Sequence, residues 1–259
     1  MLEVRDLRCA YDKTEIVHGV SFDVNDGEFV CIIGSNGCGK TTTLKNVLGL
    51  YKPTGGTVHV NGDDVLVMTD RERAKRFAYI PQAHTPPFPF NVADVVLLGR
   101  TPHLGSAVTH TTPWDLEIAY SAMETLGIQD LAHEAYTRLS GGQQQLVLIA
   151  RALCQAPDVL IMDEPTASLD FGNQQVVLSQ MRRLVEGGTG VLMVTHDPNH
   201  AFYCADKVVA MERGVVIGEG TPAEVVTTEM LARIYNARVE VQQVRAKTDN
   251  SNHSVVILL

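Results

Sequence analysis

A glycine-rich segment near the N-terminus restricts the fold more strongly than any other part of this 259-residue chain. Gly34–Thr41, with the sequence GSNGCGKT, fits the pattern G-x-x-x-x-G-K-[ST] and directly follows the apolar run Phe29–Ile33. Between a buried strand and a helix, this pattern is typical of a loop whose backbone N–H groups surround phosphate oxygens. A chance glycine-rich turn is the alternative, and the flanking strand and helical run argue against it.

This phosphate loop predicts an α/β fold with a phosphate-loop nucleoside triphosphatase core. The glycines let N–H groups approach the β- and γ-phosphates, while Lys40 supplies a positive charge and Thr41 a hydroxyl for Mg²⁺. The expected nucleotide contacts are Gly34, Ser35, Asn36, Gly37, Cys38, Gly39, Lys40, Thr41 and Thr42.

A second apolar run delivers two adjacent carboxylates. Val159–Met162 reads as a buried strand and is followed by Asp163 and Glu164. Ligands of open α/β sheets bind at the carboxyl ends of the strands. We therefore expect Asp163 to hold Mg²⁺ directly or through water, and Glu164 to orient or deprotonate the attacking water. Taken alone the segment would be read as solvated acids ending a strand, but its pairing with the phosphate loop favours the functional reading.

Two other strand ends carry weaker signals. Gln82 follows the strand-like AYIP and is expected to touch Mg²⁺ or the attacking water. His196 ends VLMVTHD and is expected to hold the γ-phosphate, although a lone strand-end histidine is more often structural. Its spacing from His200 suggests a metal site, but the intervening Pro198 and the lack of a third ligand argue against one.

The segment Leu139–Gln145, LSGGQQQ, predicts a tight turn that opens a helix. An apolar stripe follows at the spacing of one helix face, in Leu146, Ile149, Ala150 and Leu153. Unpaired N–H groups at such a helix start favour an anion. This turn has no lysine, so it raises the question of which phosphate it would hold.

The remaining pattern predicts how the elements are distributed. The first sixty residues read as short strands, with hairpin signals such as Asn61-Gly62 after Thr57–Val60, and form an antiparallel β subdomain. Ala83–Phe90 is proline-rich and predicts an irregular, exposed connection. From about 88 to 154 the pattern is helical, which predicts an inserted α-helical subdomain, and Asp115–Ile128 is its clearest amphipathic stretch.

The C-terminal part reads as strands with turn punctuation. Gly190–Val194 is a further buried strand, and Met211–Gly220 resembles a hairpin around Arg213-Gly214. Lys247–Ser254 is polar and predicts a loop, while Val255–Leu259 predicts a final strand or a core plug. The segment after Gly220 is short for a dedicated regulatory domain.

Charge and composition exclude several classes of function. A net charge of −9 argues against a general nucleic-acid binder, because such binding depends on neutralising phosphates. The five cysteines are scattered without CxxC spacing, which favours reduced thiols over a disulfide or metal framework. No apolar run approaches the ~18 residues needed to cross a bilayer, so we expect any membrane role to come through a partner.

The motifs in their order along the chain resemble those of the ATP-binding-cassette (ABC) ATPases. They are Tyr11, GSNGCGKT, YIPQ, LSGGQ, VLIMDEPTASLD and VTHD. LSGGQ begins 24 residues before Asp163, and other phosphate-loop proteins lack it. The resemblance runs from residue 2 to about 240 and implies that the chain is a single ABC ATPase domain, residues 1–259, that binds ATP and Mg²⁺.

The same resemblance implies a head-to-tail dimer of two copies of this chain. The LSGGQ turn of one copy would then close over the ATP held by the other, which already has its own lysine. The residues implied are Ser140, Gly141, Gly142 and Gln143 over the partner's nucleotide, Tyr11 stacked on adenine, and Asp170 at the dimer contact.

A finer resemblance lies in PFNVADVVLLGRTPHLG and LSGGQQQLVLIARAL. These segments are similar to the importer subunits that energise uptake of iron–siderophore, haem or cobalamin. The resemblance implies a peripheral subunit at the cytoplasmic face of the membrane. Its partners would be transmembrane permease subunits and, indirectly, a substrate-binding protein, but no nucleic acid. Two alternatives stay open: a non-transport cassette acting as a scaffold, such as in iron–sulfur cluster assembly, and a remote phosphate-loop kinase or GTPase.

Overall fold

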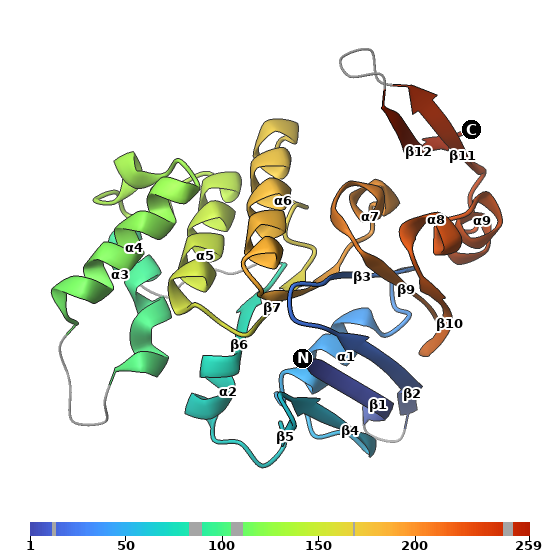
Figure 1. Cartoon of the computed structure of the whole chain (residues 1–259), viewed down its shortest axis with the longest axis horizontal. Coiled ribbons are helices and arrows are strands. Elements are labelled where there is room, and N and C mark those ends of the chain that lie inside the picture. Colours follow the sequence, from blue (N-terminus) through green and yellow to red (C-terminus); the bar gives the residue numbers. More distant parts are fainter. Residues whose placement is uncertain (12–13, 83–89, 105–110, 168, 246–250) are drawn as a thin grey trace.

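A six-stranded sheet runs through the middle of the computed structural model (Figure 1), which describes residues 1–11, 14–82, 90–104, 111–167, 169–245 and 251–259. Five of its strands are parallel, and β10 pairs antiparallel with β9 at one edge. In spatial order the strands are β10 (Val215–Gly220), β9 (Lys207–Glu212), β3 (Phe29–Gly34), β8 (Gly190–Val194), β7 (Val159–Asp163) and β6 (Phe77–Ile80).

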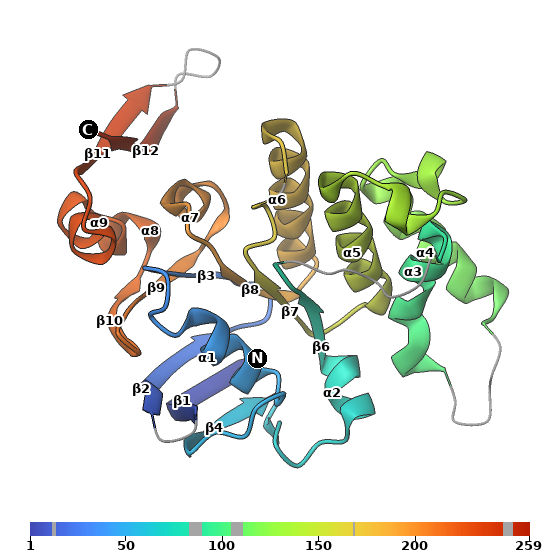
Figure 2. The same ribbon diagram turned by 180° about the vertical axis from the view of Figure 1, so that it is seen from behind.

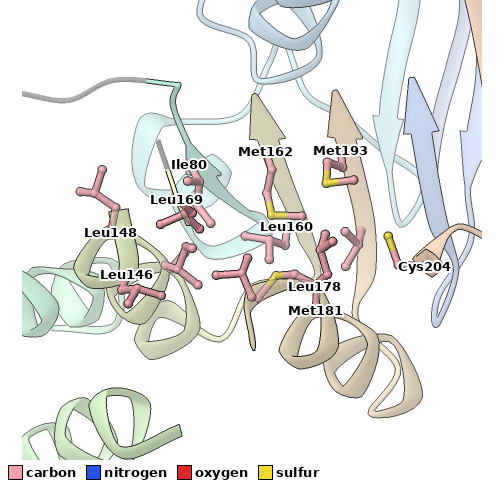
Figure 3. Close-up of a cluster of buried hydrophobic side chains, with 14 of the residues drawn as sticks. Ile80, Leu146, Leu148, Leu160, Met162, Leu169, Leu178, Met181, Met193 and Cys204 are labelled. Atoms are coloured by element: carbon pink, nitrogen blue, oxygen red, sulfur yellow. The ribbon is translucent and has the colours of Figure 1, made fainter. Parts of the chain in front are cut away.

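This central sheet is buried on both faces, which explains why its strands are continuous apolar runs rather than alternating ones. In β3, Cys31 and Ile33 point into one hydrophobic core, while Val30 and Ile32 point into the other. The core on the helical side contains Leu160, Met162 and Met193 against the helices (Figure 3).

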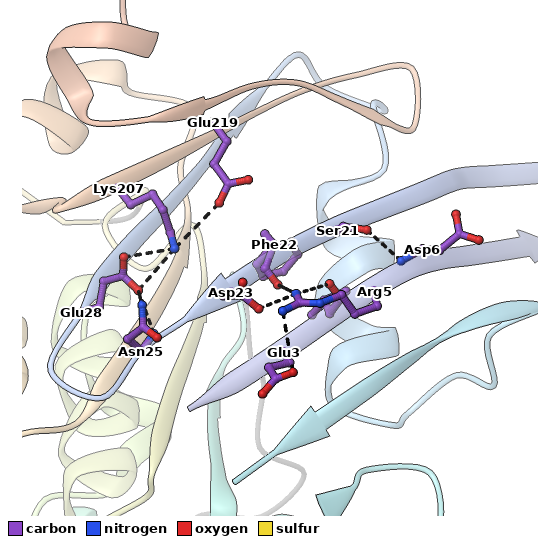
Figure 4. A network of polar contacts seen from close by, with 11 residues as sticks. Glu3, Arg5, Asp6, Ser21, Phe22, Asp23, Asn25, Glu28, Lys207 and Glu219 are labelled. Carbon is purple, nitrogen blue, oxygen red and sulfur yellow. Dashed lines mark hydrogen bonds and ion pairs between the residues drawn. The ribbon is translucent and has the colours of Figure 1, made fainter. Parts of the chain in front are cut away.

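The opposite face packs against a four-stranded antiparallel sheet. In spatial order its strands are β2 (Thr14–Val24), β1 (Leu2–Tyr11), β4 (Gly55–Val60) and β5 (Asp63–Asp64). Ion pairs and hydrogen bonds line this side of the molecule: Arg5 bonds Asp23 across β1 and β2, and Lys207 lies 3.1 Å from Glu28 (Figure 4). The sheet confirms the predicted antiparallel β portion.

Helices fill the space beside the two sheets (Figure 2). The chain order is α1 (Lys40–Val47), α2 (Asp70–Arg76), α3 (Val92–Leu97), α4 (Pro113–Thr125), α5 (Gly141–Gln155), α6 (Phe171–Glu186), α7 (Pro198–Cys204), α8 (Pro222–Val225) and α9 (Thr228–Tyr235). Between α3 and α5, the described part of the chain has three short 3-10 helices, at Leu98–His103, Gln129–Leu131 and Tyr136–Arg138. Among the described residues, no helix has the length and apolar character that crossing a membrane requires.

Both predicted hairpin turns form where the sequence places them. Asn61 and Gly62 have φ of 51° and 85° between β4 and β5, and Arg213 and Gly214 have φ of 47° and 80° between β9 and β10. Positive φ at both central residues is what a two-residue turn needs to match the twist of its strands.

The C-terminal end departs from the prediction in one place. A two-stranded hairpin, β11 (Val239–Arg245) and β12 (Asn252–Leu258), follows α9. The predicted final strand is confirmed, but the loop expected over Lys247–Ser254 is wrong for Asn252–Ser254, which pair with β11. Polar side chains are compatible with this strand because it lies in a partly exposed sheet rather than in a core. Residues 247–250 and most of the expected proline-rich connection, 83–89, lie outside the described residues.

Candidate active site

The phosphate loop joins β3 to α1 and folds around its own lysine. The Lys40 ammonium donates hydrogen bonds to the carbonyl oxygens of Gly34 (2.7 Å) and Ser35 (3.0 Å). The side chain is nearly buried, and α1 begins at Lys40 itself. The loop therefore holds a positive charge at the start of a helix, where N–H groups and the helix dipole also favour an anion.

Glycine is required at this loop for steric reasons. A Cβ on Gly34 would lie 2.5 Å from the Met211 carbonyl oxygen and 2.6 Å from the Cys38 sulfur. Gly37 and Gly39 have φ of 79° and 105°, which other residues rarely adopt. The spacing of the sequence pattern thus follows from three positions that a side chain could not occupy without strain.

Asp163 lies beside the phosphate loop at the end of β7. The residue is 4% exposed, and the Thr41 side chain lies near enough to favour the charged carboxylate. Burial is the main cause that raises the pKa of Asp163; the charge of Glu164 adds to it, and Thr41 opposes it. A carboxylate and a hydroxyl side by side, with few other protein ligands, form the oxygen donor set that Mg²⁺ takes up when phosphates complete its coordination.

Glu164 is turned away from Asp163 by an unusual backbone conformation. Its φ is 50°, in the left-handed region, and its N–H donates to the Val194 carbonyl of β8. The Glu164 carboxylate accepts a hydrogen bond from the Gln82 amide (2.7 Å) and lies 3.3 Å from Nδ1 of His196. Because β6, β7 and β8 are neighbours in the sheet, their carboxyl ends bring these three side chains together.

One pocket of about 360 Å³ unites the two halves of the site. Its lining comprises Ile16, Asn36, Gly37, Gly39, Lys40, Thr41, Thr42, Gln82 and Glu164. Lysine, hydroxyls and a carboxylate thus face one space that can hold the phosphates of a nucleotide.

Two supporting residues were missed by the sequence reasoning. Ile16 on β2 lines the pocket, and the Gly214 N–H donates to the Cys38 carbonyl of the phosphate loop (2.9 Å). A Cβ on Gly214 would lie 2.2 Å from the Ile16 carbonyl oxygen, so the hairpin turn reaches the loop only because it carries a glycine there. Nothing in the local sequence signals either contact, because both join segments far apart in the chain.

The LSGGQ turn (Leu139–Gln143) is not part of this pocket. Ser140 caps α5: its hydroxyl accepts from the Gln143 N–H (3.3 Å), and its own N–H donates to the Gln143 side chain (3.0 Å). A Cβ on Gly141 would meet no atom within 4 Å, so the turn faces open space. Within one chain, the structure does not bring Ser140, Gly141, Gly142 and Gln143 to the phosphate loop.

Two further expectations concern Tyr11 and His200. Tyr11 ends β1 opposite Thr14, but its side chain lies outside the described part of the structure. Its stacking on adenine therefore stays a prediction. His200 is buried, with Nδ1 2.9 Å from the Thr195 hydroxyl. This contact gives His200 a structural role in α7.

Comparison with known proteins identifies the family. Residues 17–167 match the family model described as ABC transporter. The hemin import ATP-binding protein of Rhizobium meliloti (strain 1021) is 34% identical over 249 residues, which cover 93% of each chain. One chain in a solved inward-facing structure of a metal-chelate type ABC transporter is similar in fold, with a TM-score of 0.86 and 30% identity. The alignment covers 100% of this chain and 96% of that chain.

The fold also matches a cassette solved as a dimer. A post-hydrolysis state of an ATP-binding cassette, bound to ADP and Pi, aligns with 86% of this chain and 99% of its own, with 27% identity and a TM-score of 0.76. The family match and the relative's coverage agree with the phosphate loop, the adjacent carboxylates and the LSGGQ turn. This chain therefore belongs to the ABC transporter family.

Proposed function

We propose that this chain is the ATP-hydrolysing subunit of an importer for a metal chelate of the iron–siderophore, haem or cobalamin class. The observation that carries the proposal is the single pocket in which Lys40, Thr41, Gln82 and Glu164 meet. The import direction and the cargo class are supported by the similarity to a hemin import protein and to a metal-chelate type transporter.

The chain is an ATPase, and its residues divide the hydrolysis step between them. Lys40 and the loop N–H groups hold the β- and γ-phosphates, so that charge developing on the γ-phosphoryl oxygens is stabilised. Glu164 takes a proton from the water that attacks the γ-phosphorus, and the bond to the bridging oxygen of ADP breaks. Gln82 donates to Glu164 (2.7 Å) and keeps the carboxylate aimed at that water.

We propose that Thr41, Asp163 and Gln82 hold Mg²⁺. Thr41 and Asp163 lie near enough for the Thr41 side chain to favour the charged carboxylate, so two oxygen donors are close together beside the phosphate loop. The ion neutralises charge on the β- and γ-phosphates when bound. His196, 3.3 Å from Glu164, is placed to donate a hydrogen bond to the γ-phosphate from the same side.

The LSGGQ turn serves a second copy of this chain in this proposal. Ser140, Gly141 and Gly142 do not line the pocket of their own chain, and in this proposal the turn of one chain completes the site of another. Asp170, which caps α6 by accepting from the Asn173 N–H (2.9 Å), is assigned to the contact between the two copies. Tyr11 is assigned to adenine.

The proposed assembly has one cassette per chain, formed by residues 1–259, with a helical subdomain at about 88–154. Closure of the dimer acts on transmembrane permease subunits through the surface beside Gln82, and the cassette sits at the cytoplasmic face of the membrane. A substrate-binding protein delivers cargo to the permease.

Uptake in cells tests this function. The gene for this chain is deleted in its native host, and uptake of radiolabelled iron–hydroxamate, haem and cobalamin is measured with and without plasmid-borne copies. We expect one cargo to depend on the wild-type chain and not to be restored by Lys40→Ala, because the loop loses its charge against the phosphates. Uptake of all three cargoes that is unchanged by deletion, or full rescue by Lys40→Ala, would contradict the proposal.

A further inference from the structure

The C-terminal hairpin β11–β12 stands at one end of the molecule beside α7 and α9 (Figures 1 and 2). Val241 and Val256 face each other across the hairpin, and their N–H groups reach outward to helices. Val241 donates to the Thr228 hydroxyl of α9 (2.9 Å), and Val256 donates to the side-chain oxygen of Asn199 on α7 (2.8 Å). The hairpin is therefore bonded by its backbone to two separate helices.

Asn199 belongs to a short segment that is fixed by its own hydrogen bonds. Its N–H donates to the Asp197 carboxylate (2.9 Å), and the Asp197 N–H donates to the Thr195 hydroxyl (3.1 Å). The same hydroxyl lies 2.9 Å from Nδ1 of the buried His200. Because these bonds tie residues 195 to 200 into one unit, holding Asn199 also holds the backbone three residues earlier.

That backbone carries His196, the side chain assigned to the γ-phosphate. The His196 side chain is 55% exposed and meets Glu164 at 3.3 Å. The backbone of residues 195 to 197 sets where the Cβ of His196 lies, and so limits the positions from which the imidazole can reach Glu164. The packing around α7 therefore decides where the imidazole lies relative to Glu164.

The contact between the hairpin and α7 is local. A groove of about 660 Å³ runs between α6, α7 and β12, and Asn199 and Val256 both line it. The bond from Val256 to Asn199 lies at the edge of this groove, next to the apolar contact that Val256 makes with the hydrophobic core. Loss of this one bond should loosen the first turn of α7, where Asn199 lies, while the buried Ala201 and Cys204 keep the helix in the core and pairing with β11 keeps the hairpin folded.

We infer that the β11–β12 hairpin positions His196 for ATP hydrolysis, and that the Val256 N–H and the Asn199 side chain make the connection. Asn199 is a positioning residue: it touches neither the pocket nor Glu164 and acts through the backbone of residues 195 to 200. The inference rests on the proposed role of His196 and adds a segment outside the nucleotide pocket to the machinery.

Two substitutions remove the bond from opposite sides. Asn199→Leu removes the acceptor, and Val256→Pro removes the donor at a strand edge where proline is tolerated. Asn199→Asp keeps an acceptor oxygen and serves as the conservative rescue. Leu258→Pro is the matched control, because Leu258 is two residues further along the same strand edge and is 79% exposed.

The readout is steady-state ATP hydrolysis by the full-length chain, with kcat and KM separated, and binding of a fluorescent ATP analogue. We expect Asn199→Leu and Val256→Pro each to lower kcat about tenfold, since small displacements of reacting groups have large effects on rate. KM and analogue binding should stay within about twofold, which also shows that the variants are folded. The double variant should be no slower than either single one, and Asn199→Asp and Leu258→Pro should retain wild-type kcat.

Wild-type kcat in both Asn199→Leu and Val256→Pro would overturn the inference. So would a loss of analogue binding in both, or additive losses in the double variant, because either result means that the substitutions act separately on the fold. A wild-type chain that binds the analogue but does not hydrolyse ATP would instead contradict the proposed function, so the two failures are distinguishable.

Discussion

At the scale of single residues, two adjacent carboxylates are turned to different surroundings by the backbone between them, and we propose that they have different tasks. Asp163 ends the strand, buried against Thr41, whereas Glu164 adopts φ of 50° and swings toward Gln82 and His196. A left-handed conformation is unfavourable for a residue with a Cβ, by about 1 to 2 kcal/mol. The hydrogen bonds of Glu164 with Val194 and Gln82 offset this strain and keep the carboxylate on the pocket wall.

Glu164→Gln tests that division of tasks. Loss of the proposed general base should slow hydrolysis by roughly 10² to 10⁴, while ATP binding persists because Lys40 and the loop are unchanged. Removing the negative charge also removes repulsion toward the γ-phosphate, so ATP-bound dimers should accumulate on size-exclusion chromatography with ATP and Mg²⁺. A monomeric variant with normal turnover would mean that Glu164 only ends a strand.

At the scale of elements, a buried ion pair holds the helical region together. Nε of Arg100 donates to the Asp115 carboxylate (3.0 Å), and another guanidinium nitrogen of Arg100 donates to the Cys154 carbonyl at the end of α5 (3.0 Å). The Thr112 hydroxyl and N–H also donate to Asp115 and close the start of α4. Hydrogen bonds from Thr112, followed by the bond and charge of Arg100, lower the pKa of Asp115 from 3.8 to about 2.

Asp115→Asn should lower the free energy of unfolding by about 3 kcal/mol at neutral pH, because Arg100 is left buried without its counter-charge. The exposed Asp130→Asn in the same region is the matched control and should change it by less than about 0.5 kcal/mol. Denaturant unfolding followed by circular dichroism gives both values.

The same pair predicts a pH dependence. The Asp115 pKa is lower in the folded chain than in the unfolded chain. As the pH falls, the Asp115 carboxylate is therefore protonated first in the unfolded chain, which favours unfolding. The stabilisation from Asp115 is therefore complete near neutral pH and declines as the pH falls from about 5 to 2. Asp115→Asn should lack this part of the acid-dependent loss; an identical decline in wild type and variant would contradict the assignment.

The elements that the sequence predicted well are those whose signal is local. Three examples are the phosphate loop, the β7 strand with its two carboxylates and the Asn61-Gly62 turn. Each is marked by a hydrophobic pattern or a steric requirement that involves only a few neighbouring residues. Contacts between distant segments carry no such signal. Ile16, Gly214 and the strand formed by Asn252–Ser254 depend on which segments the fold brings together, and sequence patterns did not reveal them.

At the scale of the whole molecule, the phosphate loop and the LSGGQ turn lie apart within one chain. The pocket holds the charged phosphate loop, and the LSGGQ turn lies outside it with its capping box at Ser140 and Gln143. Sequence reasoning could propose that the turn has no lysine because it completes another chain's site. The separation of the two parts within one chain supports that proposal, since a turn that served its own nucleotide would line the pocket.

ATP binding by isolated Ser140→Arg chains tests this account most directly. The substitution adds a bulky cation to the turn and leaves the phosphate loop unchanged, and Gln129→Arg, at another exposed position, controls for the added charge. We measure nucleotide affinity by equilibrium titration of monomers, and dimer formation by size-exclusion chromatography with ATP and Mg²⁺. The account predicts that Ser140→Arg monomers bind ATP as the wild type does, but neither dimerise nor hydrolyse ATP. The Gln129→Arg chain should bind ATP, dimerise and hydrolyse ATP. Loss of ATP binding in the Ser140→Arg monomer would contradict the account, because the turn would then serve the nucleotide of its own chain.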